Sequence, residues 1–83
     1  MKTIRGYTLI TELASGQAPL DPNTARVEFD VDTVDELPQD GMLDGYTLYQ
    51  GSIAYVIEAA KFYVLDSEGV WHDAKNGAAY VPA

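Results

Sequence analysis

The C-terminal half of the chain consists of short runs of strand-forming residues, and this pattern constrains the fold more than any other feature. The runs cover residues 46–49, 52–57, 61–65 and 70–72. Aromatic and β-branched side chains favour strands, and the Gly and Asp residues between the runs favour turns. The three-residue link 58–60 predicts a hairpin between the second and third runs. Asn76-Gly77 predicts a further hairpin with a type I′ turn.

Residues 25–31 alternate strictly between apolar and charged side chains, which predicts a strand with one buried and one solvated face. The apolar set is Val27, Phe29 and Val31, and the charged set is Arg26, Glu28 and Asp30. Residues 1–11 predict another strand, and residues 32–37 predict one helical turn that Pro38 ends. We therefore expect a mostly β fold, either a small antiparallel meander or a compact sandwich or barrel, with at most one short helical turn.

Residues 12–24 contain Gly16, Pro19 and Pro22 but few large apolar side chains, which is typical of a loop or a flexible arm. A loop of this length in so small a domain often docks on another molecule. We therefore divide the chain into an N-terminal strand with an extended, Pro-containing arm (residues 1–24) and a β-domain (residues 25–83).

The charge and composition of the chain argue against several classes of partner and site. Its 83 residues include 13 acidic and 5 basic side chains and no cysteine. A net charge of −8 argues against nucleic acid and against an anionic membrane surface, because both attract Lys and Arg. No apolar run approaches the roughly 20 residues that span a bilayer. Disulfides and thiolate metal sites are excluded, so we expect a chain this small to gain stability from a partner or from copies of itself.

Acidic residues are concentrated between positions 28 and 44, with no basic residue among them. They are Glu28, Asp30, Asp32, Asp35, Glu36, Asp40 and Asp44. An EF-hand calcium loop that began at Asp30 would need Gly at its sixth position and Glu at its twelfth, where this chain has Asp35 and Gly41. A solvated acidic surface is therefore favoured, with calcium or a basic partner surface as the alternative.

No arrangement of side chains typical of catalysis occurs in the sequence. His72 is the only histidine, and no serine or carboxylate lies at a triad-like spacing from it. In a strand over residues 70–72, His72 points away from Trp71, so a structural or incidental role is favoured. No Gly-rich loop followed by Lys is present to hold a phosphate. We therefore expect no enzyme activity, no catalytic residue, no cofactor and no metal site.

Apolar side chains occupy both faces of the predicted hairpin. Ile53, Tyr55 and Ile57 share one face of the first strand, and Phe62 and Tyr63 lie on opposite faces of the second. One face can form the core, while the other needs cover from another layer or subunit. Core or interface packing is favoured over a sugar-stacking platform. We expect four structural or interface residues: Tyr55, Phe62, Tyr63 and Trp71.

Five segments between positions 34 and 71 form a pattern. They are Val34-Asp35-Glu36-Leu37-Pro38, Asp40-Gly41, Gly51-Ser52-Ile53-Ala54-Tyr55-Val56, Lys61-Phe62-Tyr63-Val64-Leu65-Asp66 and Gly69-Val70-Trp71. This pattern resembles a short β-module of tailed-bacteriophage virion structural proteins, which include head fibres, tail fibres and small accessory capsid proteins. In the compact form of that module the Leu-Pro leads almost directly into the glycine strand, so residues 42–50 depart from it.

The resemblance implies a non-enzymatic virion protein, in the first place a capsid decoration or accessory protein or a head-fibre-base protein. It implies binding to the major capsid protein or another virion protein, and a homo-oligomer for which a trimer is the first expectation. The protein would be made in the bacterial cytoplasm and would reside in the virion. The alternative is a carbohydrate- or receptor-binding module of a phage fibre that uses surface Tyr and Trp side chains.

Overall fold

The computed structural model describes residues 2–81, and within them it contains seven strands and one 3-10 turn. The elements are β1 (Lys2–Leu9), β2 (Thr24–Val31), η1 (Val34–Glu36), β3 (Met42–Leu43), β4 (Tyr46–Leu48), β5 (Ile53–Val56), β6 (Lys61–Leu65) and β7 (Trp71–Asp73). The prediction of a mostly β fold with at most one short helical turn is confirmed. Strand β3 is the one element that the sequence analysis did not predict, because it lies in a segment rich in turn residues.

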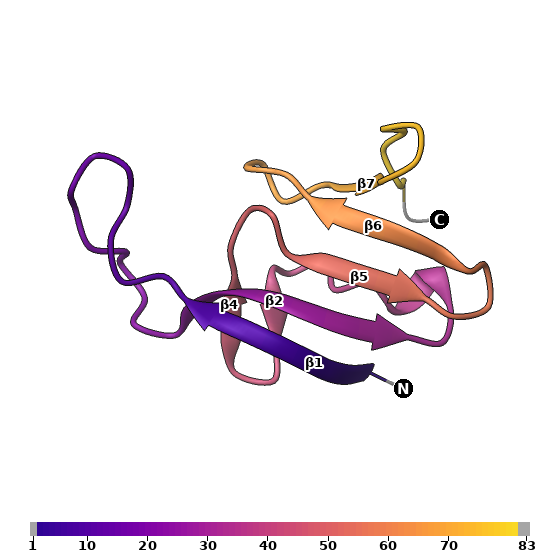
Figure 1. Cartoon of the computed structure of the whole chain (residues 1–83), viewed down its shortest axis with the longest axis horizontal. Helices are drawn as coiled ribbons and strands as arrows, with labels where there is room; N and C mark the ends of the chain where they lie inside the picture. The colour runs from indigo at the N-terminus through magenta and orange to yellow at the C-terminus, as the bar shows by residue number, and fades with distance from the viewer. Residues whose placement is uncertain (1, 82–83) are drawn as a thin grey trace.

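The seven strands of the described chain form one sheet in the order β3-β4-β2-β5-β6-β7, with β1 paired to the other side of β2 (Figure 1). Strand β2 is the centre of this arrangement. Both β4 and β5 use the side of β2 that faces away from β1. Just after β4, the N–H of Tyr49 donates to the carbonyl of Ala25 at 2.9 Å, and just after β5, the N–H of Ile57 donates to that of Val31 at 2.9 Å.

The sheet is mixed, because β2 runs antiparallel to β1 but parallel to β4 and β5. It therefore differs from a simple antiparallel meander, in which every neighbour is antiparallel. Parallel neighbours need a crossover connection instead of a tight turn. Residues 32–45 supply it; the part before β3 passes behind the sheet in Figure 1. Strands β5, β6 and β7 alone form the expected meander, and the β5–β6 hairpin turns at residues 57–60, as predicted.

The core lies between the sheet and this crossover connection. Its members are Ala25, Val27, Phe29 and Val31 of β2, Ala54 and Val56 of β5, and Leu37, Leu43, Leu48, Leu65 and Trp71. The Trp71 side chain is 1% exposed, and its ring packs edge-on against Phe29 with the centroids 5.7 Å apart. Its Nε1–H donates to the carbonyl oxygen of Pro38 at 2.8 Å. The indole thereby joins β7 to the connection that covers the core.

The turn at Asn76-Gly77 differs from the type I′ hairpin that the sequence predicts. A type I′ turn needs positive φ at both central residues. Gly77 has φ of +75°, but Asn76 is not among the residues with positive φ. Asp73 instead closes a longer loop, because its N–H donates to the carbonyl of Ala78 and its carbonyl accepts from Gly77. Asn76 Oδ1 accepts from the N–H of Ala78 at 2.9 Å, and this side-chain bond favours the longer loop.

Strand β1 pairs with β2 along its whole length, so the N-terminal strand belongs to the same sheet as the strands of residues 25–73. Residues 10–23 extend beyond the sheet as a loop, at the left of Figure 1. The N–H of Leu13 donates to the carbonyl of Gln17 at 2.7 Å and turns this loop back on itself, and Leu20 is fully exposed. The docking of this arm on another molecule stays a prediction.

Candidate functional site

The face of the sheet opposite the core, here called the outer face, is the strongest candidate for a functional surface. On β5, β6 and the residue after β5 it carries five apolar side chains, here called the apolar patch: Ile53, Tyr55, Ile57, Phe62 and Val64. In the strand register Ile53 pairs with Val64 and Tyr55 with Phe62, so their side chains lie next to each other. The Tyr55 and Phe62 rings are 4.8 Å apart. Ile57 and Phe62 are each 51% exposed, so the patch is open to solvent.

Charged side chains of β1 and β2 border the patch on one side. Glu28 pairs with Ile53 in the register, and Asp30 pairs with Tyr55. The Asp30 carboxylate accepts from Arg5 Nε at 2.8 and 3.0 Å. Arg5 reaches it from a register shift in β1, between Ile4 and Gly6. The charged set that the sequence assigns to the solvated face of β2 therefore lies beside the patch.

Arg26 lies on the outer face next to Gly51, and this glycine makes room for the arginine stem. A Cβ at Gly51 would lie 3.3 Å from Arg26 Cδ, and Gly51 has φ of +89°. Both the positive φ and the close approach favour glycine here. Gly51 thus serves the break between β4 and β5 and the placement of Arg26, rather than a phosphate.

His72 borders the patch on the β7 side, because it pairs with Val64 in the register. Its Nδ1 lies 3.0 Å from the carbonyl oxygen of Gly77, and its Nε2 lies 2.7 Å from Oδ2 of Asp66. A carbonyl only accepts, so Nδ1 carries a proton, and the carboxylate favours a proton on Nε2 as well. The hydrogen bond to Gly77 and then the one to Asp66 raise the pKa of His72 above its ordinary 6.5. The geometry therefore fits the imidazolium ion.

The Asp66 carboxylate, in the β6–β7 turn, accepts hydrogen bonds from the backbone as well as from His72. Its Oδ1 accepts from the N–H groups of Glu68 and Val70, at 2.8 and 2.9 Å. The bond from Val70, then the one from His72, lower the pKa of Asp66. His72 and Asp66 thus form an ion pair that links β7 to the turn before it, while Gly77 links His72 to the turn after it.

The four aromatic residues singled out from the sequence fall on two faces. Tyr55 and Phe62 meet in the apolar patch, whereas Trp71 is buried in the core. Tyr63 is half-buried on the core side, where its ring meets that of Tyr80 edge-on at 6.3 Å. The structure therefore brings together one pair of the four.

The pairs Arg5–Asp30 and His72–Asp66 are the feature of the outer face that the sequence analysis missed. The His72–Asp66 pair was within reach of sequence reasoning, because a turn that begins at position 66 brings that position next to the following strand, which carries position 72. The Arg5–Asp30 pair depends on the register of β1 on β2 and on the shift at Arg5. No local sequence signal marks that shift.

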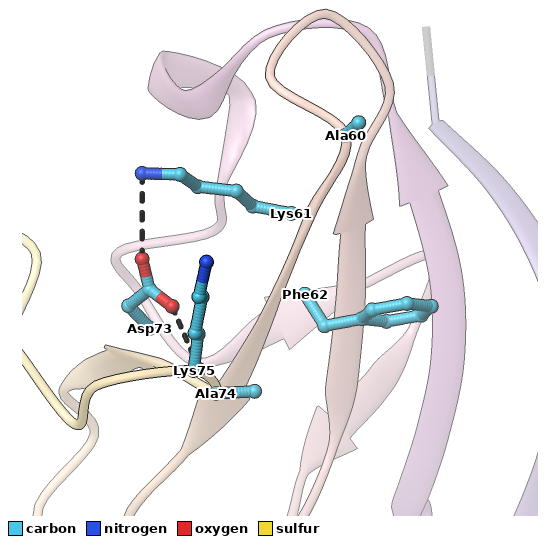
Figure 2. A pocket seen from close by; sticks show the side chains of 6 residues that line it. All are labelled: Ala60, Lys61, Phe62, Asp73, Ala74 and Lys75. Carbon is cyan, nitrogen blue, oxygen red and sulfur yellow. Dashed lines mark hydrogen bonds and ion pairs between the residues drawn. The ribbon is translucent and has the colours of Figure 1, made fainter.

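A small hollow beside the start of β6 and the end of β7 is the second candidate. It has a volume of about 280 Å³ and is lined by Ala60, Lys61, Phe62, Asp73, Ala74 and Lys75 (Figure 2). Lys61 Nζ lies 3.5 Å from Oδ2 of Asp73, and the backbone N–H of Lys75 donates to Oδ1 at 2.8 Å. That N–H, followed by the Lys61 ammonium, lowers the pKa of Asp73. The single carboxylate is thus already occupied, and Figure 2 shows the Phe62 ring pointing away from both lysines.

Two of the acidic residues at positions 28–44, Glu36 and Asp40, accept hydrogen bonds from nearby backbone N–H groups. Glu36 accepts from the N–H groups of Asp32 and Thr33 at the start of η1, and Asp40 accepts from that of Met42. Within residues 2–81 no group of three His, Asp or Glu side chains is arranged to hold a metal ion. The same residues include no helix that is long and apolar enough to cross a membrane.

Comparison of the chain with known proteins finds no matching family model, no matching curated protein and no matching solved structure.

Proposed function

We propose that this chain is a non-enzymatic structural protein of a tailed-bacteriophage virion, a capsid accessory protein or a head-fibre-base protein. Its partners are the major capsid protein or another virion protein, together with further copies of the chain. The observation that carries the proposal is the apolar patch on the outer face. The sequence resemblance supplies the viral context, in which a trimer is the expected oligomer.

The patch has the properties of a docking surface. Exposed apolar area of this kind contributes about 25 cal/mol per Å² when a partner covers it. The patch lies on a hairpin whose strands pair through four register positions, so its shape is set before a partner arrives. A preformed surface loses little conformational entropy on binding. Ile57 and Phe62 are therefore expected to be covered in the assembled state.

The titratable groups favour a structural role. His72 is bonded to Asp66 and Gly77, and Asp73 is bonded to Lys61 and the Lys75 backbone. General acid–base catalysis needs such groups within reach of a substrate proton. In this chain the same groups stabilise turns and strand ends.

The second candidate is a carbohydrate- or receptor-binding module. The exposed ring pair of Tyr55 and Phe62, with Glu28 and Asp30 next to it in the register, favours it. Trp71 cannot contribute a stacking face, because its ring is buried in the core. The ring pair alone offers a smaller platform than the Tyr and Trp surface expected from the sequence.

The test is incorporation into particles. A phage that lacks this gene is complemented with wild-type chain, with Phe62→Asp or with Tyr7→Asp, and particles are purified on a density gradient. Tyr7 is a matched control, because it is 54% exposed, about as much as Phe62, but lies on the other face of the sheet. Its register partner, Val27, is a core residue. We expect the wild type and Tyr7→Asp in the particle fraction at a constant ratio to the major capsid protein, and Phe62→Asp to be lost from it.

Absence of the wild-type chain from the particles contradicts the proposal. Binding of the wild type to a glycan array, abolished by Phe62→Asp but not by Tyr7→Asp, favours the carbohydrate-binding module instead.

A further inference from the structure

Charge is distributed unevenly between the outer face and the rest of the molecule. The outer face, counted with the residues that directly follow β2 and β6, carries three cationic and four acidic side chains: Arg5, Arg26, His72, Glu28, Asp30, Asp32 and Asp66. Asp32 is included because the pairing of β2 with β5 continues to it, where its carbonyl accepts from the N–H of Glu58. With His72 protonated this face has a charge of −1. The other nine acidic side chains and three lysines give the rest of the chain a formal charge of −6. The outer face is thus much less acidic than the rest of the chain and repels a second copy less.

The charges of this face are also largely neutralised within the molecule. Arg5 is paired with Asp30, and His72 is paired with Asp66. Charges that are already paired need no partner across an interface, and they cost little when they lie at its solvated rim. A partner for this face therefore needs apolar surface more than it needs charge.

The size and layout of the face match a weak dimer in exchange with its monomer. The described chain measures 38 × 23 × 20 Å, but the longest dimension includes the loop at residues 10–23 that extends beyond the sheet (Figure 1). The footprint of the sheet is therefore smaller than the roughly 800 Å² that each partner buries in a standard interface, and small interfaces are typical of transient association. The apolar patch occupies β5 and β6, and charged rows lie on β1–β2 and beside β7. An apolar centre with a polar rim is the usual anatomy of an interface.

We infer that the outer face binds the outer face of a second copy, so that the chain forms a twofold dimer with the apolar patch at its centre. This inference identifies the partner of the patch and rests on the proposed function only in treating the patch as an interaction surface. Two identical faces in contact close the assembly at two subunits. The inferred state therefore differs from the trimer that the sequence resemblance implies.

Sedimentation equilibrium of the purified chain tests the inference. The expected mass is twice 9.1 kDa, in exchange with the monomer. Phe62→Asp is expected to weaken the dimer at least about 30-fold, because it puts a charge at the centre of the contact. Tyr7→Asp, which adds the same charge to an equally exposed ring on the opposite face, is expected to leave the dissociation constant unchanged. Near-UV circular dichroism of Trp71 verifies that each variant is folded.

A second pair of variants tests the charge argument. Arg26→Glu makes the outer face more acidic by two charges and is expected to weaken the dimer about fivefold. Lys75→Glu makes the same change in net charge away from this face and is expected to have no effect. Equal changes in the dissociation constant for the two variants would show that only total charge matters. That result would overturn the assignment of the dimer contact to the outer face.

The wild-type mass decides the matter even if a variant fails to fold. A chain that is monomeric at every concentration, or trimeric, overturns the inferred dimer. A monomer that still enters particles refutes the dimer and leaves the proposed function standing. A dimer that never enters particles supports the dimer and refutes the proposed function.

Discussion

The two faces of the sheet are formed by the same strands, but one is buried and the other is open to solvent. On the core face, Phe29 and Trp71 pack edge-on and the crossover connection closes over them. On the outer face, Tyr55 and Phe62 form a similar ring pair, but nothing in the described chain covers them. Ion pairs occur on both sides, with Arg5–Asp30 and His72–Asp66 on the outer side and Lys61–Asp73 on the core side at the end of the sheet.

The comparison shows that apolar alternation alone does not decide which side of a strand is buried. Residues 53–57 present Ile and Tyr to the outer face and the smaller Ala54 and Val56 to the core. Burial follows the path of the connection at residues 32–45, which crosses one face and leaves the other open. The larger side chains of β5, Ile53 and Tyr55, are therefore only partly buried.

The sharpest test of this contrast places a carboxylate on either face at neighbouring positions. Ala54 is completely buried, so Ala54→Asp buries an unpaired charge and should remove the whole stability of the domain, about 5 kcal/mol or more. Tyr55→Asp should cost about 1 kcal/mol and leave a folded chain. Urea unfolding measures both free energies. An Ala54→Asp variant as stable as Tyr55→Asp would show that the faces are assigned wrongly.

Trp71→Ala tests the core face alone. Truncating a buried Trp typically costs about 3–5 kcal/mol, which is close to the expected stability of so small a domain. We therefore expect the purified variant to be largely unfolded by circular dichroism. Trp71→Phe retains most of the apolar area but loses the hydrogen bond to Pro38, so a smaller loss is expected. A cooperative thermal transition of Trp71→Ala at the wild-type temperature would contradict the anchoring role.

Ser52→Ala tests the buried hydroxyl on the core face. Ser52 Oγ donates to the carbonyl of Tyr49 at 2.7 Å and accepts from the N–H of Val27 at 3.2 Å. It thus supplies an acceptor to β2 at the break between β4 and β5. Leaving buried groups unsatisfied should cost about 1–3 kcal/mol in urea unfolding. The exposed Ser67→Ala is the control and should change stability by no more than about 0.5 kcal/mol.

The pH dependence of stability tests the outer face and should show the smallest effect. Because the folded state raises the pKa of His72, the stabilisation is complete below about pH 6.5 and is lost as pH rises through the raised pKa. The wild type should therefore unfold at lower urea concentration at about pH 8.5 than at about pH 6. His72→Ala should be slightly less stable at the lower pH and should lose this difference. A wild-type urea midpoint that is higher at about pH 8.5 than at about pH 6 would contradict a stabilising His72–Asp66 ion pair.

The sequence predicts the faces of the strands better than it predicts their neighbours. Alternation at residues 25–31 correctly assigns Val27, Phe29 and Val31 to the core, and the link at residues 58–60 correctly predicts the β5–β6 hairpin. Alternation contains no information about which strand lies alongside, so the parallel pairing of β2 with β4 and β5 was not foreseen.

The candidate site was predictable only in part, for a similar reason. Both faces of the β5–β6 hairpin are apolar in the sequence, and the choice between them depends on where the crossover connection passes. The placement of Trp71 and His72 on opposite sides of β7 follows from alternation and agrees with the structure. The link from His72 to Gly77 depends on the conformation of the loop at residues 74–77, which the type I′ prediction misjudged.

The register shift at Arg5 also affects the outer edge of the sheet at β1. Strand β1 pairs with β2 on one side only within the described chain, so its other edge has free backbone groups that invite a strand from another molecule. An irregular strand bearing a charged side chain is a poor template for such pairing, because the bulge interrupts the regular spacing of donors and acceptors. The bulge that places Arg5 on Asp30 therefore also protects this edge of the sheet against the addition of a further strand.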